Sequence, residues 1–327
     1  MNQNSKPQKN LVMGLVKTYN FEKIKPFLLS LRNTGYEGDI CFLVGDLAPE
    51  TIAGIREFGV DVQAFNELYF QLPLYRNGKW AMKKIYPYHR LVNLYPINRL
   101  NYWIVKKLTT GKRGSYRTKS QIASLFVHVM CVRYPLYYLY LSKYGHQYDK
   151  IMLTDVRDVI FQRDPFDFEI GDRLCCFFEE EGKTLDVGDA NTEWIAQGFG
   201  TEALQEIGHC RTSCSGTTIG SRDAILNYLE VMIDRMLALK CHTWGIDQGV
   251  HNYILHKGLV PNVKFYNNYQ GPILTMHYSE ASKLKFNEQG YLVNEDGSTI
   301  NVLHQYDRQS PEIKSQMTVY QRSECVC

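Results

Sequence analysis

The sequence has little excess of charge of either sign, and this limits what the protein can bind. Its 327 residues include 37 Lys and Arg and 34 Asp and Glu, which gives a formal charge of +3. Proteins that bind nucleic acid over a broad surface carry a clear basic excess. We therefore expect no nucleic-acid partner.

Hydrophobic runs suited to a membrane are also missing. The first ten residues are polar and no apolar segment of the length of a signal-peptide core follows them, so we expect no secretory signal. The most apolar window, residues 122–141, contains Arg133 and Pro135, and an arginine is costly inside a bilayer. This window predicts a buried helix and no integral membrane segment.

The nine cysteines form no C-x-x-C pair, and the sequence has no internal repeat or low-complexity segment. An odd number of cysteines, several of them in apolar stretches, is typical of reduced thiols rather than of a disulfide framework. We expect a cytoplasmic protein, with peripheral attachment to the inner membrane face as a further option.

Strand and helix patterns alternate over the first part of the chain. Short apolar runs are typical of buried strands, and Asn, Pro and Gly supply the helix boundaries between them. The strands are expected at 11–16, 40–44 and 60–65, and the helices at 20–32 and 49–59. This βαβαβ order predicts a mostly parallel sheet of the Rossmann type with flanking helices.

The rest of the chain continues this α/β pattern after an interruption. Residues 67–117 are rich in Tyr, Lys and Arg and contain several prolines, which predicts an insertion with broken helices; it is either an acceptor-side subdomain or a packed surface insertion. The elements expected after it are a helix at 118–144, strands at 150–154, 174–178 and 215–219, an amphipathic helix around 225–236, and short strands and turns after 260.

The most informative segment is YDKIMLTDVRDVIFQRDPF, residues 148–166, in which an apolar strand runs into Asp155 and Asp158. Ligands of parallel α/β sheets bind beyond the carboxyl ends of the strands. Two carboxylates placed there repel one another unless a cation joins them, and oxygen ligands favour Mg²⁺ or Mn²⁺. The alternative is a pair of capping or turn aspartates, one of them paired with Arg157.

This segment resembles the D-x-D region of the GT-A-fold glycosyltransferases, in which an apolar strand ends in two aspartates and an Asp-Pro turn follows. Here that turn is Asp164-Pro165. The sequence departs from the family pattern because Arg157 stands where the second aspartate is expected. Asp158 can join Asp155 only if the chain has already left the strand in a turn or bulge.

Two further segments are similar to the same family. GIDQGVHN, residues 245–252, looks like a stretch found in retaining members, which implies that Asp247 and Gln248 bind the donor sugar near its reacting carbon. The alternative is a helix cap with a polar face. The resemblance also implies a late histidine as the remaining metal ligand: His304 is the best candidate and His277 its rival, although a lone histidine is often only a hydrogen-bonded core residue.

The resemblance also implies where the nucleotide sugar binds. The loop after the first strand would contact the nucleoside through Thr18, Tyr19 and Asn20, and Asp46 after the second strand would bind base or ribose. Gly216 and Thr217, in the small-residue segment 214–218, would lie under the sugar, unless this segment is only a tight joint between strand and helix. Arg133 lies in an apolar helix, so its charge must be paired with an anion, either a phosphate or a motif aspartate.

The function implied is a Mn²⁺- or Mg²⁺-dependent glycosyltransferase of GT-A-like fold. It would move a sugar from a nucleotide-diphosphate sugar, UDP being favoured, to a glycan, lipid-linked or protein acceptor, as in polysaccharide biosynthesis. The segment around Asp247 favours a retaining mechanism. Glu179, Glu180 and Glu181 are candidate bases for an inverting one, but we expect them to form a solvated charge run.

Two alternatives stay open at this point. A sugar-nucleotide pyrophosphorylase would carry a Gly-rich, Arg-containing loop after the first strand, where this chain has Lys17-Thr-Tyr-Asn20. A non-catalytic nucleotide-sugar-binding protein would be compatible with Arg157 in the motif, since an arginine can take the place of a metal.

The expected organisation is a flexible N-terminus (1–10), one domain (11–310) and a C-terminal tail (311–327). The domain is made of a nucleotide-binding part (11–66), the insertion (67–117) and a part for metal, sugar and acceptor (118–310).

Overall fold

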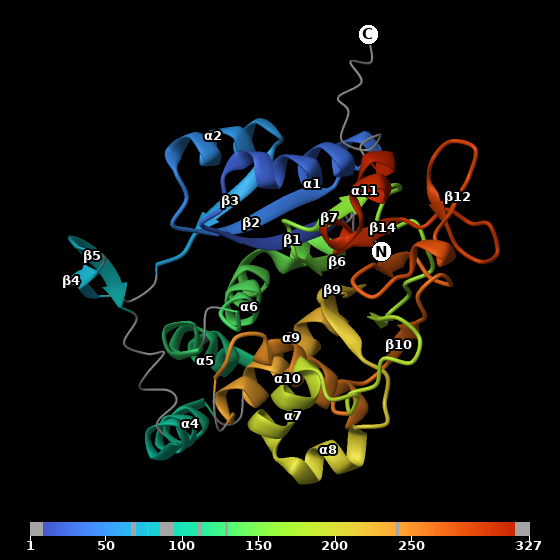
Figure 1. Cartoon of the computed structure of the whole chain (residues 1–327). Coiled ribbons are helices and arrows are strands. Elements are labelled where there is room, and N and C mark those ends of the chain that lie inside the picture. Colours follow the sequence, from blue (N-terminus) through green and yellow to red (C-terminus); the bar gives the residue numbers. More distant parts are fainter. Residues whose placement is uncertain are drawn as a thin grey trace, which may run out of the picture.

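A mixed seven-stranded sheet forms the centre of the protein, in the strand order β10-β8-β9-β6-β1-β2-β3 (Figure 1). The computed structural model describes residues 9–66, 70–76, 78–85, 95–109, 113–127, 130–239 and 242–317. The strands of this sheet are β1 (Lys9–Lys17), β2 (Asp39–Gly45), β3 (Val60–Ala64), β6 (Tyr148–Thr154), β8 (Leu174–Phe178), β9 (Ser213–Ser221) and β10 (Val263–Tyr266). Only β9 runs antiparallel to its neighbours, so the predicted mostly parallel α/β fold is confirmed.

Helices cover both faces of this sheet, because its central strands are apolar on both sides. Along β1, Leu11 and Met13 pack into the hydrophobic cluster that includes α6 and α9, whereas Val12 and Val16 pack into the cluster that includes α1. The longer helices are α1 (Phe21–Asn33), α2 (Pro49–Glu57), α4 (Tyr95–Thr109), α5 (Arg113–Phe126), α6 (Arg133–Tyr144), α7 (Ala190–Phe199), α9 (Arg222–Leu237) and α10 (Ile246–His256).

The βαβαβ prediction for the first part of the chain is confirmed, including its helix boundaries. Asn20 is the N-cap of α1, with its side chain accepting a hydrogen bond from Lys23 N, and Pro49 stands in the first turn of α2. The strands predicted at 150–154, 174–178 and 215–219 correspond to β6, β8 and β9.

A second, smaller sheet of three strands lies beside the end of β6. It consists of β7 (Val159–Phe161), β11 (Ile273–Thr275) and β14 (Val302–His304), with β14 in the middle. Ser30 on α1 joins it to the first part of the chain, because its Oγ accepts a buried hydrogen bond of 3.1 Å from Phe161 N.

The remaining short elements are α8 (Thr201–Ile207), β12 (Lys285–Phe286), β13 (Leu292–Val293), α11 (Pro311–Met317) and the 3-10 turns at Gly145–Gln147, Ala281–Lys283 and Tyr306–Arg308.

Two predictions about the middle of the chain were wrong. The single helix expected at 118–144 is two helices, α5 and α6, and Pro135 lies in the first turn of α6, where proline is tolerated and a helix begins afresh. The insertion expected to hold only broken helices also contains a hairpin of β4 (Phe70–Arg76) and β5 (Lys79–Ile85), seen at the left in Figure 1. The sequence Asn77-Gly78 was its overlooked turn signal.

Some of the predicted features fall wholly or partly on residues that the structure does not describe. The six cysteines in the described part of the chain are free, as predicted. Residues 1–8 of the N-terminus expected to be flexible, residues 318–327 of the C-terminal tail, and residues 67–69, 77, 86–94 and 110–112 of the insertion lie outside the described residues. Lys9 and Asn10, also expected to be flexible, begin β1 instead. The division of the chain into functional parts stays a prediction.

Replacing Ser30 by Ala is expected to lower the unfolding free energy by about 1–3 kcal/mol, because the buried Phe161 N–H loses its acceptor. Urea unfolding of the purified variant measures this. Ser142→Ala is the matched control, since the exposed Ser142 hydroxyl bonds only within its own helix. Equal effects of the two substitutions would contradict the proposed role of Ser30.

Candidate functional site

Three polar segments meet at the carboxyl edge of the parallel strands. Asp155 follows β6, Thr18 follows β1 and Asp46 follows β2, and these strands are neighbours in the sheet. Thr18 and Asp46 have left-handed backbone conformations, with φ of 59° and 57°, which are uncommon for residues other than glycine. Strained residues of this kind concentrate at functional sites.

The two aspartates of the D-x-x-D segment lie together because the chain turns sharply after β6. β6 ends at Thr154 and β7 begins at Val159, so residues 155–158 form the turn between them. β7 pairs with β14 so that Val159 stands opposite His304. One ligand atom each from Asp155, Asp158 and His304 falls within 4.8 Å of the others, whereas His277 is exposed and bonded to Arg308.

His304 is oriented with one ring nitrogen toward the acidic pair. Its Nδ1 lies 3.6 Å from Cys214 Sγ. Its Nε2 is buried, lies 3.5 Å from Asp155 Oδ2 and makes no hydrogen bond. A buried ring nitrogen without a partner is costly, and beside two carboxylates it is suited to a cation.

Gly216 on β9 borders the same atoms. Its carbonyl accepts a hydrogen bond of 2.7 Å from Asp155 N. A Cβ at this position would lie 2.5 Å from His304 Cε1 and 2.6 Å from Asp155 Oδ2. The missing side chain therefore lets the His304 ring and the Asp155 carboxylate approach the backbone of β9 closely.

A buried arginine connects the D-x-x-D segment to α10. Arg133 Nη1 donates a hydrogen bond of 2.6 Å to Asp155 Oδ1, and Nη2 donates one of 2.5 Å to Asp247 Oδ2. Of the two anions considered for Arg133, a phosphate or a motif aspartate, the structure pairs it with the aspartate. Burial opposes ionisation of Asp155, but Arg133 and His304 together outweigh it and hold the pKa of Asp155 below its usual range.

The side chain of Gln248, the residue directly after Asp247, is held in a chain of polar side chains. Its Nε2 donates to Glu179 Oε1 at 3.1 Å and to Asn191 Oδ1 at 2.7 Å, and its Oε1 lies 3.7 Å from Cys214 Sγ. Because Cys214 also contacts His304, this chain connects α10 to the D-x-x-D segment.

The prediction that Glu179, Glu180 and Glu181 form a solvated charge run was wrong for the first two. Glu179 and Glu180 are 4% and 6% exposed, and Glu180 is paired with Lys283. Burial raises the pKa of Glu179 from its ordinary value of 4.5 to about 7. The signal was present in the sequence, because Glu179 follows the buried strand β8 just as Asp155 follows β6.

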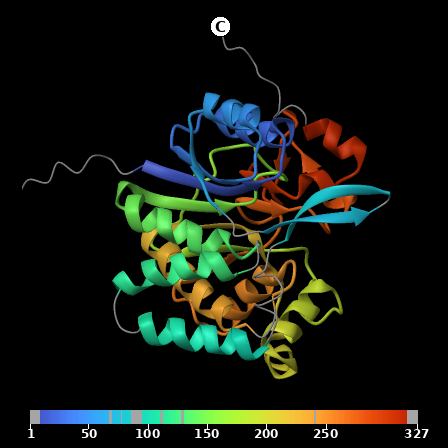
Figure 2. The same cartoon turned by 90° about the vertical axis from the view of Figure 1, so that its left-hand side faces the viewer.

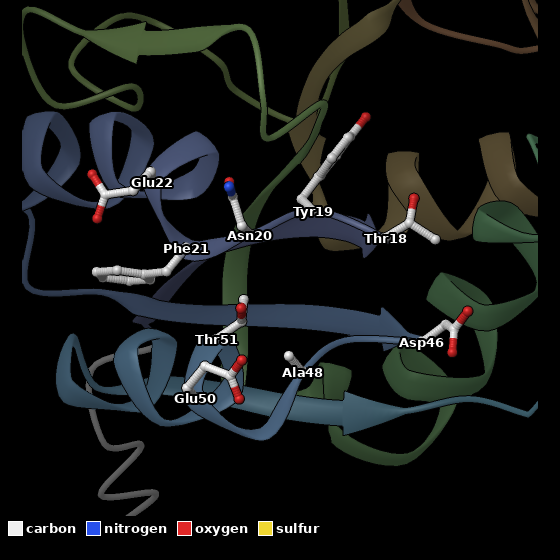
Figure 3. A pocket seen from close by; sticks show the side chains of 9 residues that line it. All are labelled: Thr18, Tyr19, Asn20, Phe21, Glu22, Asp46, Ala48, Glu50 and Thr51. Atoms are coloured by element: carbon white, nitrogen blue, oxygen red, sulfur yellow. The ribbon is translucent and has the colours of Figure 1, made fainter.

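The four residues predicted to contact the nucleoside line one pocket of about 600 Å³ (Figure 3). Thr18, Tyr19, Asn20 and Asp46 are joined there by five further residues at the starts of α1 and α2: Phe21, Glu22, Ala48, Glu50 and Thr51. Burial raises the pKa of Tyr19, and the charges of Arg157, Asp155 and Asp158 also act on it. Tyr19, which lines the pocket, is therefore near enough to the acidic pair for its charges to act on the Tyr19 hydroxyl.

The structure thus brings most of the predicted site residues into two adjoining groups. Arg133, Asp247 and Gly216 surround the acidic pair and His304. Thr217 is fully buried and its hydroxyl makes no hydrogen bond. Asn191 and Cys214, which lie in the polar chain around Gln248, were not among the predicted site residues. Cys214 begins the small-residue segment 214–218 that was expected under the sugar, whereas no pattern indicated Asn191.

Comparison with known proteins gives distant likenesses only. No family model and no curated protein matches the chain. Similar solved structures include the bifunctional glycosyltransferase WbbM in its apo form, at 12% identity and a TM-score of 0.47 over 98% of this chain and 51% of that one. Another is core-mannan synthase A (CmsA/Ktr4) from Aspergillus fumigatus in its Mn/GDP form, at 13% identity and a TM-score of 0.40 over 81% of this chain and 74% of that one.

The first of these proteins is named a bifunctional glycosyltransferase and the second a mannan synthase. The chain spans about half the length of WbbM. With TM-scores below 0.5, neither likeness bears on the function of this chain. Among the described residues, none of the helices combines the length and the apolar character needed to cross a bilayer.

Replacing Glu179 by Gln is expected to raise the unfolding free energy relative to the wild type, by a difference that grows as pH rises from about 4.5 to about 7. The folded state binds the Glu179 proton more tightly than the unfolded chain does, so the wild type loses stability across this interval, on the order of 3 kcal/mol in total. Glutamine does not titrate. Urea unfolding at several pH values measures the difference, with the exposed Glu181→Gln as control. A difference that does not change with pH would contradict the buried, proton-binding state of Glu179.

Proposed function

We propose that the protein is a divalent-cation-dependent glycosyltransferase that uses a nucleotide-diphosphate sugar. The observation that carries the proposal is the group of Asp155, Asp158 and His304, placed at the carboxyl edge of the sheet beside the pocket of Thr18 and Asp46. Acidic ligands next to a pocket of nucleotide size are the arrangement needed to bind a diphosphate through a metal.

The residues of this group fit a divalent cation. Asp155 Oδ1 is taken by Arg133, which leaves Oδ2 on the side of His304 and Gly216. With a hydrogen on Nδ1 directed at Cys214, His304 keeps a lone pair on Nε2. Mn²⁺ or Mg²⁺ held there would neutralise the charge that develops on the departing diphosphate.

The adjoining pocket suits the nucleoside better than the phosphates. Glu22, Asp46 and Glu50 line it, and carboxylates repel phosphate but accept hydrogen bonds from ribose hydroxyls and base N–H groups. Tyr19 offers a ring for stacking at the side nearer the acidic pair. UDP remains the proposed nucleotide, with GDP as the comparison in the test below.

The donor sugar is proposed to lie between Gly216 and the start of α10, beside Asp247 and Gln248. Arg133 and the polar chain fix the positions of these two side chains, which can then bind sugar hydroxyls and stabilise a cationic transition state with retention. One observation favours inversion instead: Glu179, with a pKa of about 7, has the proton affinity of a general base. The anomeric form of the product distinguishes the two.

The acceptor proposed is a glycan, a lipid-linked glycan or a protein, as part of polysaccharide biosynthesis at a cytoplasmic location. A second function, binding without catalysis, is favoured by one contact. Arg157 lies 3.2 Å from Asp158 and 3.3 Å from Asp307, so that a cationic side chain already occupies part of the acidic group. A protein of this kind would bind the nucleotide without a metal.

Replacing Asp155 by Asn is expected to reduce nucleoside-diphosphate release from a nucleotide sugar on the order of a hundredfold or more, since it removes a charged ligand worth several kcal/mol. A panel of UDP- and GDP-sugars incubated with Mn²⁺ measures the release, with and without a chelator. Asp167→Asn, which removes an exposed carboxylate paired only with Arg163 in the described structure, is the matched control and should retain activity.

Two outcomes would overturn the proposal. Release that a chelator and Asp155→Asn leave unchanged would exclude the acidic group as the metal site. Nucleotide binding without turnover and without metal dependence would instead support the binding protein, with Arg157 in the place of the metal.

A further inference from the structure

Residues 68–148, which hold the insertion and helices α5 and α6, have a charge distribution that the balanced total conceals. They contain 14 Lys and Arg and no Asp or Glu, so the other residues carry 23 Lys and Arg against 34 Asp and Glu. Two of the 14, Lys119 and Arg133, are buried and paired with aspartates elsewhere in the chain. The remaining positive excess in this quarter of the chain indicates an anionic partner.

The same region also exposes most of the large apolar side chains. Nine of the eleven exposed large hydrophobic residues in the described part of the chain lie between residues 72 and 125. Those on the β4–β5 hairpin are Leu72, Leu74, Tyr75, Trp80 and Met82, and those on α4 are Leu100, Trp103 and Ile104. We call these two elements the docking surface.

The hairpin cannot bury these side chains by itself. β4 and β5 pair only with one another, in a two-stranded sheet separate from the central one. Tyr75 and Trp80 face each other across it at 5.4 Å and remain 63% and 72% exposed. An isolated hairpin is marginally stable in water, and an exposed apolar patch of this kind marks a surface that is covered by a partner.

Helix α4 repeats the combination of apolar and basic side chains. Leu100, Trp103 and Ile104 share one face, at the spacing of an amphipathic helix, and Lys107 lies with its Nζ 4.9 Å from the centre of the Trp103 ring. In Figure 1 the hairpin and α4 lie on the same side of the molecule, and Figure 2 shows that side facing the viewer.

We propose that the docking surface binds the surface of an anionic lipid bilayer. Trp and Tyr prefer the headgroup region, Leu, Ile and Met enter the acyl boundary, and Lys and Arg bind anionic headgroups. Nucleic acid would use the positive charge but leaves the aliphatic side chains uncovered. A second copy of the chain would cover them, but it would bring two surfaces of the same charge together.

Co-sedimentation of the full chain with vesicles tests the proposal without any enzymatic turnover, so its outcome is independent of the proposed function. Phosphatidylcholine vesicles are compared with phosphatidylcholine–phosphatidylglycerol vesicles at low and high salt. The wild type is expected to bind the anionic vesicles at least about tenfold more tightly than the neutral ones, and less tightly at high salt.

Two double variants and one control locate the surface. W80S/W103S removes the two tryptophans and K79E/K107E reverses two charges, and each is expected to weaken binding on the order of tenfold or more. The control, K25E/W244S, makes the same kinds of change at exposed positions on α1 and beside α10 and should stay within about twofold of the wild type.

Equal binding to both kinds of vesicle, or unchanged binding by both docking-surface variants, would overturn the proposal. So would a wild-type dimer that W80S/W103S converts to a monomer in gel filtration, if no vesicles are bound. Binding of duplex DNA by the wild type without vesicle binding would assign the surface to nucleic acid instead.

Discussion

The buried ion pairs of Arg133 hold the site together. Asp155 and Asp247 come from segments about 90 residues apart and bind the same guanidinium. The Asp247 side chain is only 3% exposed and would otherwise be a buried carboxylate without a counter-charge, whereas that of Asp155 is 35% exposed. Removing one partner of a buried pair typically costs about 3–5 kcal/mol, because the other charge stays uncompensated. Arg133 therefore fixes the end of β6 against the start of α10, and the position of the Asp155 carboxylate beside Gly216 and His304 depends on that fixation.

Much of the fold could be predicted from the sequence because many of its helices and strands can be recognised from their own residues alone. The apolar run that became β1 and the Asn20 cap of α1 need no distant partner to be recognised. The break between α5 and α6 was missed because the apolar pattern continues through it. Pro135, in the first turn of α6, was not interpreted as the sign of a helix start. The β4–β5 hairpin was missed because tyrosines and prolines obscured its turn signal.

The site was predictable in outline for the same reason. Asp155 follows a buried strand and could be chosen from its own segment. His304 was chosen because the resemblance to the glycosyltransferases implies a late histidine ligand. The partners of Arg133 and the burial of Glu179 depend on which strands and helices become neighbours, and that cannot be read from one segment. The charge run at Glu179 was misjudged because charged residues in sequence are usually solvated.

The most direct test of the central claim, that the group at the end of β6 binds a divalent cation, is a crystal soaked with Mn²⁺ and a nucleoside diphosphate. Manganese gives an anomalous diffraction signal that locates the ion without reference to activity. The account predicts one strong peak in contact with Asp155, Asp158 and His304, with the diphosphate beside it. A diphosphate bound next to Arg157 with no peak at these three residues would contradict it.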